Sequence, residues 1–254
     1  MKEVLEDIKR SPSRNYYIVR QIITNNLHGV DIMEGAVEIA KLRFWLWLIS
    51  QVEPKEAEGR KIETLPNLDY NLLEGNSLIG FVDIKDIAKT LSSWLGESKE
   101  EWLKNLAKEK QKFKTLPVRD AAKLKERLDD EIGKAREFLH EKFFEMAKAK
   151  GIEMPYKDYE DFAEDLKLFH WGFEFYDAFD LDKPKEERGF DVVIGNPPYI
   201  SYYSRQAKPI ESHILSTYQN FYEFLSGKNK KSINTVMLFL EKGVQLLSNN
   251  RYLR

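Results

Sequence analysis

The sequence contains no cysteine. Disulfide bonds and thiolate metal sites are therefore excluded, and a reducing compartment is expected. Long apolar runs are also absent, because the longest, residues 44–49, is far shorter than the roughly 20 residues of a membrane-spanning helix. The opening residues, MKEVLEDIKR, contain no apolar core of a signal peptide. We therefore expect a cytoplasmic protein with no membrane partner.

An excess of charge of one sign is missing too, since 40 basic residues face 42 acidic ones. The balance is uneven along the chain, because residues 188–254 hold nine Lys or Arg but only four Asp or Glu. Such a basic region is compatible with a surface that faces phosphates. No pair among the four histidines has the spacing of metal ligands, so no metal site is expected. A content of 42% hydrophobic and 32% charged residues excludes a wholly disordered or collagen-like chain.

The first 76 residues have the pattern of an α/β protein. A short apolar strand at 27–32 closes on an acidic residue and follows a helix at 17–26. The next helix, 34–49, is apolar on most faces, which predicts burial between neighbours. A second strand at 69–76 runs into a Gly-Asn turn.

Residues 86–150 differ in kind, because 27 of the 54 residues from 97 to 150 are charged. One apolar row steps by three or four residues and predicts a long helix: Leu124, Leu128, Ile132, Ala135, Leu139, Phe143 and Met146. A partner helix at 94–113 and a turn at 115–117 would complete a helical hairpin inserted between two strands. Either a solvated spacer or an arm that binds DNA or a protein fits this composition.

The last third returns to α/β character. An aromatic segment at 169–175 is expected as a strand or turn, and 190–195 is the clearest strand of the sequence. An amphipathic helix at 233–247 then stops at 248–250, and a further strand opens near Tyr252. These alternating elements predict an α/β layered fold.

Asn196, Pro197, Pro198 and Tyr199 directly follow the clearest strand. Two prolines end strand pairing and hold the backbone rigid at the carboxyl end of a strand, where open α/β sheets bind ligands. Tyr199 can stack on a planar base, while the Asn196 side-chain oxygen and the Pro197 carbonyl each accept one N–H of its exocyclic amine. Two acceptors would localise the nitrogen lone pair for attack on a methyl group. The alternative is a rigid loop without chemistry.

This tetrad resembles the amino-methyltransferase motif of S-adenosylmethionine-dependent adenine DNA methyltransferases, and most closely the methylase part of type IIG restriction-modification enzymes. Matching blocks occur in the order of that family: 25–32 with 36–43, 65–68 with 75–80, 170–175, and 190–200. The resemblance implies a Rossmann-like fold, here incomplete and carrying a long helical insertion. It divides the chain into a cofactor half at 1–84, the insertion at 85–168 and a catalytic part at 169–254.

The same resemblance implies roles for single residues. Asp31 would accept hydrogen bonds from the ribose hydroxyls of S-adenosylmethionine, although an N-cap of the following helix is the alternative. Ile32 would flank the adenine of the cofactor, and Asn76 would bind the amine of that adenine, unless it only forms a turn. Asn196, Pro197, Pro198 and Tyr199 would act on an adenine flipped out of double-stranded DNA, because the target amine is otherwise paired and stacked. The basic and aromatic residues after the tetrad, Tyr202, Tyr203, Arg205 and Lys208, could contact flanking phosphates or form a packed loop.

The sequence departs from that family at both ends. No glycine-rich loop of the kind that holds the methionine part of the cofactor precedes Asp31, and no target-recognition domain follows residue 254. Three functions therefore stay open. The chain could be an adenine-specific DNA methyltransferase, a non-catalytic fragment that needs a complementing protein chain, or a helical interaction module. Within the first, related motifs also serve enzymes that methylate RNA bases or protein glutamine.

Overall fold

The computed structural model describes residues 13–53, 64–152, 156–198 and 235–253, together with Glu6, Ile8 and Ser11. These residues form two compact units. The first contains Met1–Gly75 and Lys104–Glu131, and the second contains Asn76–Leu103 and Ile132–Arg254. Each unit is described by itself below.

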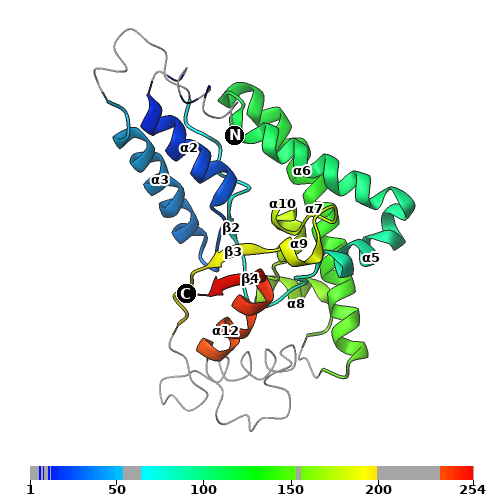
Figure 1. The fold of residues 1–254 in the computed structure, drawn as a ribbon. Helices are drawn as coiled ribbons and strands as arrows, with labels where there is room; N and C mark the ends of the chain where they lie inside the picture. Colours follow the sequence, from blue (N-terminus) through cyan, green and yellow to red (C-terminus); the bar gives the residue numbers. More distant parts are fainter. Residues whose placement is uncertain are drawn as a thin grey trace. The chain divides into compact units, whose positions relative to one another are not determined.

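The first unit begins with the expected helix–strand–helix order (Figure 1). Its elements are α2 (Arg14–Asn26), β1 (Gly29–Asp31), α3 (Glu34–Ser50) and β2 (Leu72–Glu74). β1 and β2 pair in parallel, with Gly29 opposite Leu72 and Asp31 opposite Glu74. Both predicted strands are therefore confirmed, and the parallel pairing agrees with an α/β class.

Asn71 fixes this strand pair to the preceding helix. Its buried side-chain amide donates hydrogen bonds to the carbonyls of Thr24 and Leu27, at 3.0 and 2.9 Å. The Gly29 N–H donates in turn to the Asn71 carbonyl at 2.8 Å. These bonds set the position at which β1 ends, and therefore the position of Asp31.

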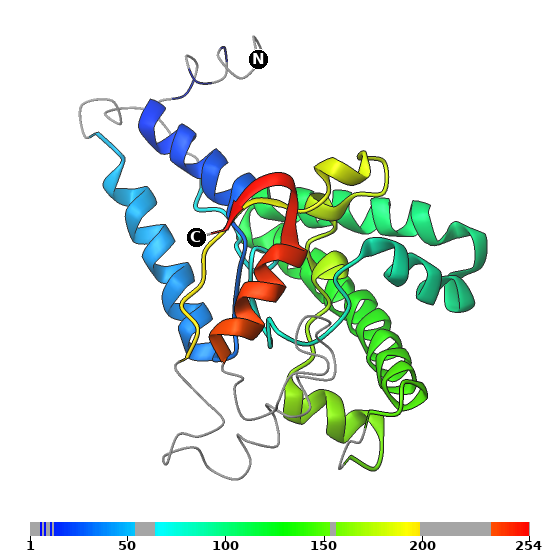
Figure 2. The same cartoon turned by 60° about the horizontal axis from the view of Figure 1, so that its bottom comes forward.

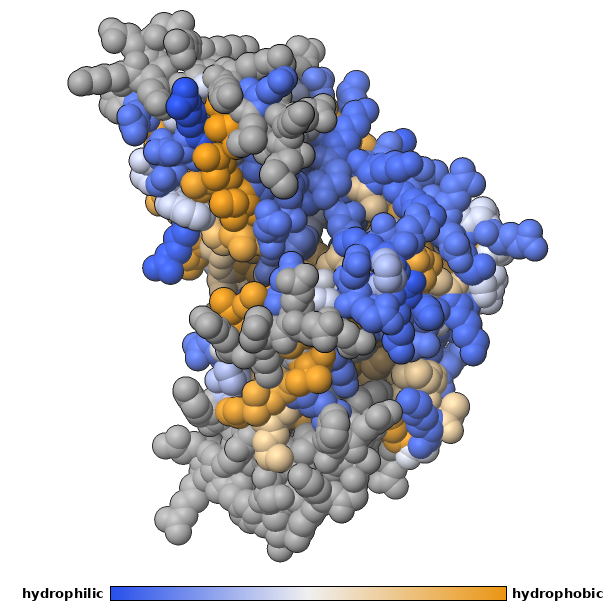
Figure 3. All heavy atoms as spheres, viewed as in Figure 1, coloured by the Kyte–Doolittle hydropathy of each residue, from blue (hydrophilic) through white to orange (hydrophobic). Residues whose placement is uncertain are grey.

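Helix α3 is covered on one side only. Val37, Lys41 and Leu48 are buried, and Leu48 packs in a core with Tyr16, Ile23 and Leu68. Phe44 and Trp45 are partly buried against this core, whereas the large apolar side chains of the other side of α3 stay exposed. Figure 3 shows apolar side chains gathered in a band over α2 and α3. The predicted burial between neighbours is therefore wrong for half of the helix, because α2 and the strands β1 and β2 pack against a single side.

The helices of the central region contribute to both units. They are α5 (Ile84–Leu95), the 3₁₀ turn η1 (Gly96–Ser98), α6 (Lys99–Thr115) and α7 (Val118–Ala149). The turn predicted at 115–117 is confirmed, because α6 ends at Thr115 and α7 begins at Val118. Figures 1 and 2 show α7 as one long unbroken helix.

The apolar row of α7 is buried as its spacing predicts. Leu128, Ile132, Ala135, Leu139 and Phe143 are each less than 5% exposed. A solvated spacer is therefore the wrong interpretation, since these side chains belong to the interior. Residues 104–131 group with the first unit and residues 132–149 with the second. The division of the chain at residues 84 and 168 stays a prediction.

The second unit also contains short helices and the second strand pair. Its further elements are α8 (Tyr159–Leu166), α9 (Trp171–Glu174), α10 (Tyr176–Phe179), the 3₁₀ turn η2 (Lys185–Glu187), β3 (Phe190–Val193), α12 (Thr235–Leu246) and β4 (Leu247–Leu253). β3 and β4 pair in parallel, with a register irregularity between Phe190 and Val192. β4 starts directly after α12, several residues before the expected position.

Two predictions for this unit are wrong. Of the two alternatives for the aromatic segment at 169–175, the strand is wrong, because the segment contains the single helical turn α9 and its rings are buried without alternation. On α12 the expected apolar face is not the buried one: Leu240 and Val244 are exposed, whereas Glu241 and Lys242 are buried. The pattern correctly predicts an amphipathic helix, but the side of α12 that packs against the rest of the unit is the opposite one.

Candidate functional site

The residues Asn196 to Pro198 follow β3 at its carboxyl end, as the sequence predicts. Gly189, just before this strand, has a φ of +114°. A Cβ there would lie 2.6 Å from the Leu246 carbonyl oxygen, so only glycine lets β3 run beside the junction of α12 and β4. The pairing of β3 with β4 then fixes the direction in which the chain leaves the strand.

The start of α12 holds the two prolines in place. The hydroxyl of Thr235, a buried residue, donates a hydrogen bond to the Pro198 carbonyl. Asn196 is exposed and Pro197 half-buried. The two prolines restrict the backbone beside Asn196. The exposed side-chain oxygen of Asn196 is therefore held in a position suited to accept an N–H from a ligand.

Tyr199 lies outside the described residues, and so do Tyr202, Tyr203, Arg205 and Lys208. Their stacking and phosphate-binding roles therefore stay predictions. The part of the motif that the structure describes consists of Asn196, Pro197 and Pro198.

Asp31 ends β1 with an exposed side chain. Its Oδ1 accepts a hydrogen bond from the Met33 N–H at 2.8 Å, which forms a turn that leads into α3. Ile32, the next residue, is half exposed. The carboxylate therefore has a structural role at the start of the helix, and it is also accessible to a ligand.

Asn76 is 5% exposed and has a structural role in the second unit. Its Oδ1 accepts the Leu78 N–H at 3.1 Å, and its backbone N–H donates to the Lys167 carbonyl at 2.8 Å. These bonds support the interpretation of Asn76 as a turn residue. A contact with the cofactor adenine stays a prediction.

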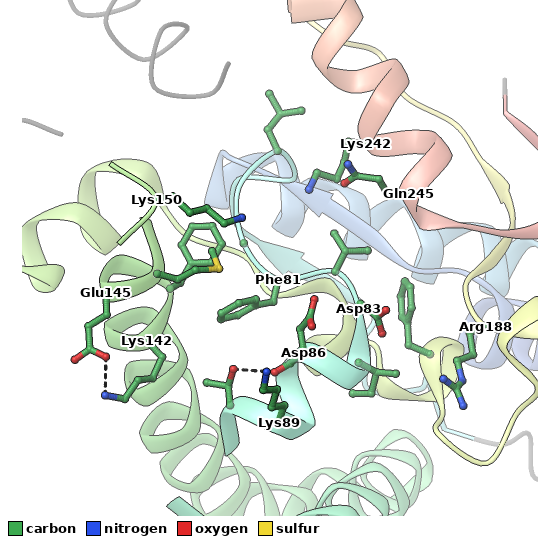
Figure 4. A pocket seen from close by; sticks show the side chains of 18 of the residues that line it. Phe81, Asp83, Asp86, Lys89, Lys142, Glu145, Lys150, Arg188, Lys242 and Gln245 are labelled. Atoms are coloured by element: carbon green, nitrogen blue, oxygen red, sulfur yellow. Dashed lines mark hydrogen bonds and ion pairs between the residues drawn. The ribbon is translucent and has the colours of Figure 1, made fainter. Parts of the chain in front are cut away.

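A cavity of about 1070 Å³ in the second unit had no counterpart in the sequence predictions (Figure 4). Lys150 and Lys242 line it from different helical regions, and Lys142 pairs with Glu145 at 2.8 Å. Burial lowers the pKa of Lys242 to about 8, against an opposing effect of Glu241. None of Asn196, Pro197 and Pro198 is among the described residues that line the cavity. The pair Glu241-Lys242 inside an otherwise apolar helix was the signal that could have located it.

Two buried histidines were also missed. The His170 Nδ1 accepts the Phe81 N–H at 3.0 Å, and the His140 ring lies 5.1 Å from the His170 ring. Burial lowers the pKa of His140 to about 4, and burial with His140 and Arg136 nearby lowers that of His170 well below its usual value. Both rings are therefore neutral at pH 7 and support the structure rather than acid–base chemistry.

Within the described ranges, no group of three or more His, Cys, Asp or Glu side chains has an arrangement that could hold a metal ion. The helices described in this structure also include none that is long and apolar enough to cross a bilayer.

The model of the Eco57I restriction-modification methylase family matches residues 25–254. This chain belongs to that family. A relative from Methanocaldococcus jannaschii, named "Putative type II restriction enzyme and methyltransferase RM.MjaORFECS2P", is 28% identical over 305 residues. The match covers 98% of this chain but only 24% of the relative. No solved structure matches the methylase chain.

Proposed function

We propose that this chain is the central part of a methyltransferase that transfers a methyl group from S-adenosylmethionine to the exocyclic amine of adenine in DNA. Its restriction-modification family and the described motif at the carboxyl end of β3 support this proposal. The observation that carries most weight is the exposed Asn196 amide, followed by two prolines that Thr235 anchors. The parallel pairs β1–β2 and β3–β4 suit an incomplete Rossmann-like fold.

The motif would prepare the amine for attack. The Asn196 side-chain oxygen and the Pro197 carbonyl each accept one amine hydrogen, which localises the nitrogen lone pair. S-adenosylmethionine would supply an electrophilic methyl group on a sulfonium. The amine nitrogen forms the new bond to the methyl carbon as the carbon–sulfur bond breaks, and the extra proton leaves to water after transfer. No group in this set needs a strongly shifted pKa.

Asp31 fits the cofactor on chemical grounds. An exposed carboxylate directly after a parallel strand is suited to accept hydrogen bonds from ribose hydroxyls. Ile32 adds a half-exposed apolar surface beside it, suited to the face of an adenine ring. The resemblance places Asn76 beside the amine of that adenine, and this contact is part of the proposal.

The DNA partner would be a duplex from which the target adenine is flipped. Unstacking costs a few kcal/mol, and stacking on Tyr199 would offset part of that cost. The basic residues between 188 and 254 would contact neighbouring phosphates, which makes binding weaken as salt rises.

A second candidate function is a subunit or fragment that acts only with a complementing chain. One observation favours it: the match covers only 24% of the length of the relative. In that case the catalytic motif is present, but cofactor binding depends on residues of the partner.

Calorimetry with S-adenosylmethionine, followed by a methyl-transfer assay on adenine-containing duplex DNA, tests the proposal. We expect Asn196→Ala to lower the transfer rate by about 100-fold or more, because one acceptor for the developing charge is lost. The matched control is Asn25→Ala, which removes an exposed amide on α2. Circular dichroism should be unchanged in both variants. Equal rates for Asn196→Ala and the unchanged chain would refute the catalytic role, and cofactor binding only after addition of a second chain would favour the fragment.

A further inference from the structure

One row of apolar side chains on α3 is open to solvent. Ile39, Leu42, Leu46 and Ile49 are 52 to 59% exposed, and we call them the α3 stripe. Met33 and Trp47 beside the stripe are 65% and 42% exposed. Five large exposed apolar side chains on one helix, with Ile32 and Met33 directly before it, exceed the scattered exposure that is normal for a protein surface.

The stripe faces away from the interior of the first unit. The side of α3 that packs inward carries Val37, Lys41 and Leu48. A helix that is apolar all around its circumference is normally buried on every side. The inward side of α3 meets this rule and the stripe does not, which identifies the stripe as a surface made for contact.

The spacing of the stripe selects a helix as its partner. From Ile39 to Ile49 the steps are three, four and three residues, which is the pattern of two helices packed along each other. Gly35 continues the row toward Ile32, and nothing lies within 4 Å of the position where its Cβ would be. A partner can therefore approach the α3 backbone closely at this end. The stripe offers few hydrogen-bonding groups, so neither a β-strand nor a nucleic acid suits it.

Charged residues on both sides of the stripe define the partner further. Glu38 and Arg43 are exposed on the two flanks, at the positions that form ion pairs across paired helices. Glu38 also pairs with Lys41 of α3 at 2.8 Å, and its exposed carboxylate can accept from a second cation. A fitting partner helix carries apolar residues at three- and four-residue steps, a basic residue opposite Glu38 and an acidic residue opposite Arg43.

The length of the stripe indicates where this helix comes from. α3 has 17 residues, little more than two heptads, and a single contact of that length is too small for a stable complex of separate molecules. Within one polypeptide the same contact suffices, because the effective concentration is high. The relative from Methanocaldococcus jannaschii has about three quarters of its length outside the match. We propose that an amphipathic helix from that remaining part of the restriction-modification polypeptide covers the α3 stripe.

The same substitution in two proteins tests this. Leu42→Asp with Leu46→Asp in this chain should leave the melting temperature nearly unchanged, because both side chains are already exposed. Binding of an apolar dye such as ANS should fall by about half, since the dye reports exposed apolar surface. In the full-length relative, aspartates at the two aligned positions should lower the melting temperature by at least about 5 °C, because two carboxylates would be buried against an apolar helix.

Leu48→Asp is the matched control. Leu48 is buried in this chain, so the substitution should destabilise both proteins. Aspartates tolerated equally in both proteins would overturn the proposal, and so would a large loss of stability in this chain alone. Analytical ultracentrifugation supplies the remaining outcome: a dimer of this chain that the two aspartates dissociate would make a second copy the occupant and refute the intramolecular helix. These measurements do not depend on methyl transfer, so they stand or fail apart from the proposed function.

Discussion

Two histidines and one glycine show how single residues respond to their surroundings. His28 and His140 are kept neutral by burial, and Lys114 beside His28 and Arg136 beside His140 further disfavour protonation. Gly80, with a φ of +137°, permits a contact with Phe169 that any side chain would block. Their roles are structural, and each gives a measurable consequence.

The stability of the protein should fall in mild acid. The pKa of His28 and of His140 is lowered from 6.5 to about 4, so the unfolded chain binds more protons between these values. The stabilisation is fully present above pH 6.5 and is lost as the pH falls toward 4, with roughly 3 kcal/mol for each histidine as an order of magnitude. Urea unfolding at pH 7.5 and 4.5 measures the effect.

His28→Gln supplies the control for that experiment, because it removes one titrating group while keeping a polar side chain. The difference in unfolding free energy between the two pH values should shrink by the contribution of His28, roughly 3 kcal/mol as an order of magnitude. An identical difference in the variant and the unchanged chain would show that His28 does not titrate between these pH values.

Gly80→Ala should destabilise the second unit. The new Cβ would lie 2.0 Å from the Phe169 carbonyl oxygen, and the backbone conformation disfavours side chains as well. A loss of at least about 2 kcal/mol follows. Gly133→Ala is the matched control: nothing lies within 4 Å of its Cβ position in α7, so the variant should be more stable by roughly 0.5–1 kcal/mol. Thermal unfolding of both variants decides, and equal melting temperatures would contradict the prediction.

At the scale of elements, the sequence pattern identified most helices and strands but not what they pack against. α2, β1, α3, β2, β3 and the turn between α6 and α7 all occur where the pattern places them. The errors concern α9, the buried face of α12 and the open side of α3. In each case the pattern records that apolar side chains need contacts, while the identity of the neighbour depends on residues far away in the sequence.

Asn71→Ala tests the link between α2, β1 and β2. The variant loses the hydrogen bonds to the Thr24 and Leu27 carbonyls. The Thr24 carbonyl keeps the hydrogen bond from the Lys114 Nζ at 2.9 Å, so the Leu27 carbonyl is the acceptor that depends more on Asn71. We expect a loss of about 1–3 kcal/mol in the stability of the first unit. Hydrogen exchange of β1 amides measures the effect locally. Unchanged protection of the amides of Gly29 and Val30 would show that the strand pair holds itself in place.

At the scale of the whole molecule, the charged central region is part of both interiors. Leu103 and Phe113 are buried together with the apolar row of α7, and the two compact units divide this region between them. This central region is therefore a structural component, in contrast to the spacer that its composition suggested.

Deletion of residues 86–150 should abolish cooperative folding. The deletion removes α5, α6 and α7, and with them buried side chains of both units, so loss of activity in such a variant would carry no information on DNA binding. Near-ultraviolet circular dichroism and urea unfolding provide the measurement. A deletion variant that unfolds cooperatively with unchanged stability would show that the remaining chain is independent of these helices.

The sequence by itself determined the family, the α/β character and the position of Asn196-Pro197-Pro198 after a strand, because short motifs and local periodicity depend on neighbouring residues only. Tertiary structure alone decided which sides of α3 and α12 are buried, that Asn76 is a buried turn residue, and that His140 and His170 are neutral. These properties arise from contacts between residues distant in the chain, where burial and electrostatics act through space. The open side of α3 illustrates both contributions. The apolar residues of the sequence predict that α3 is buried all around, and the structure identifies the side that is exposed to solvent.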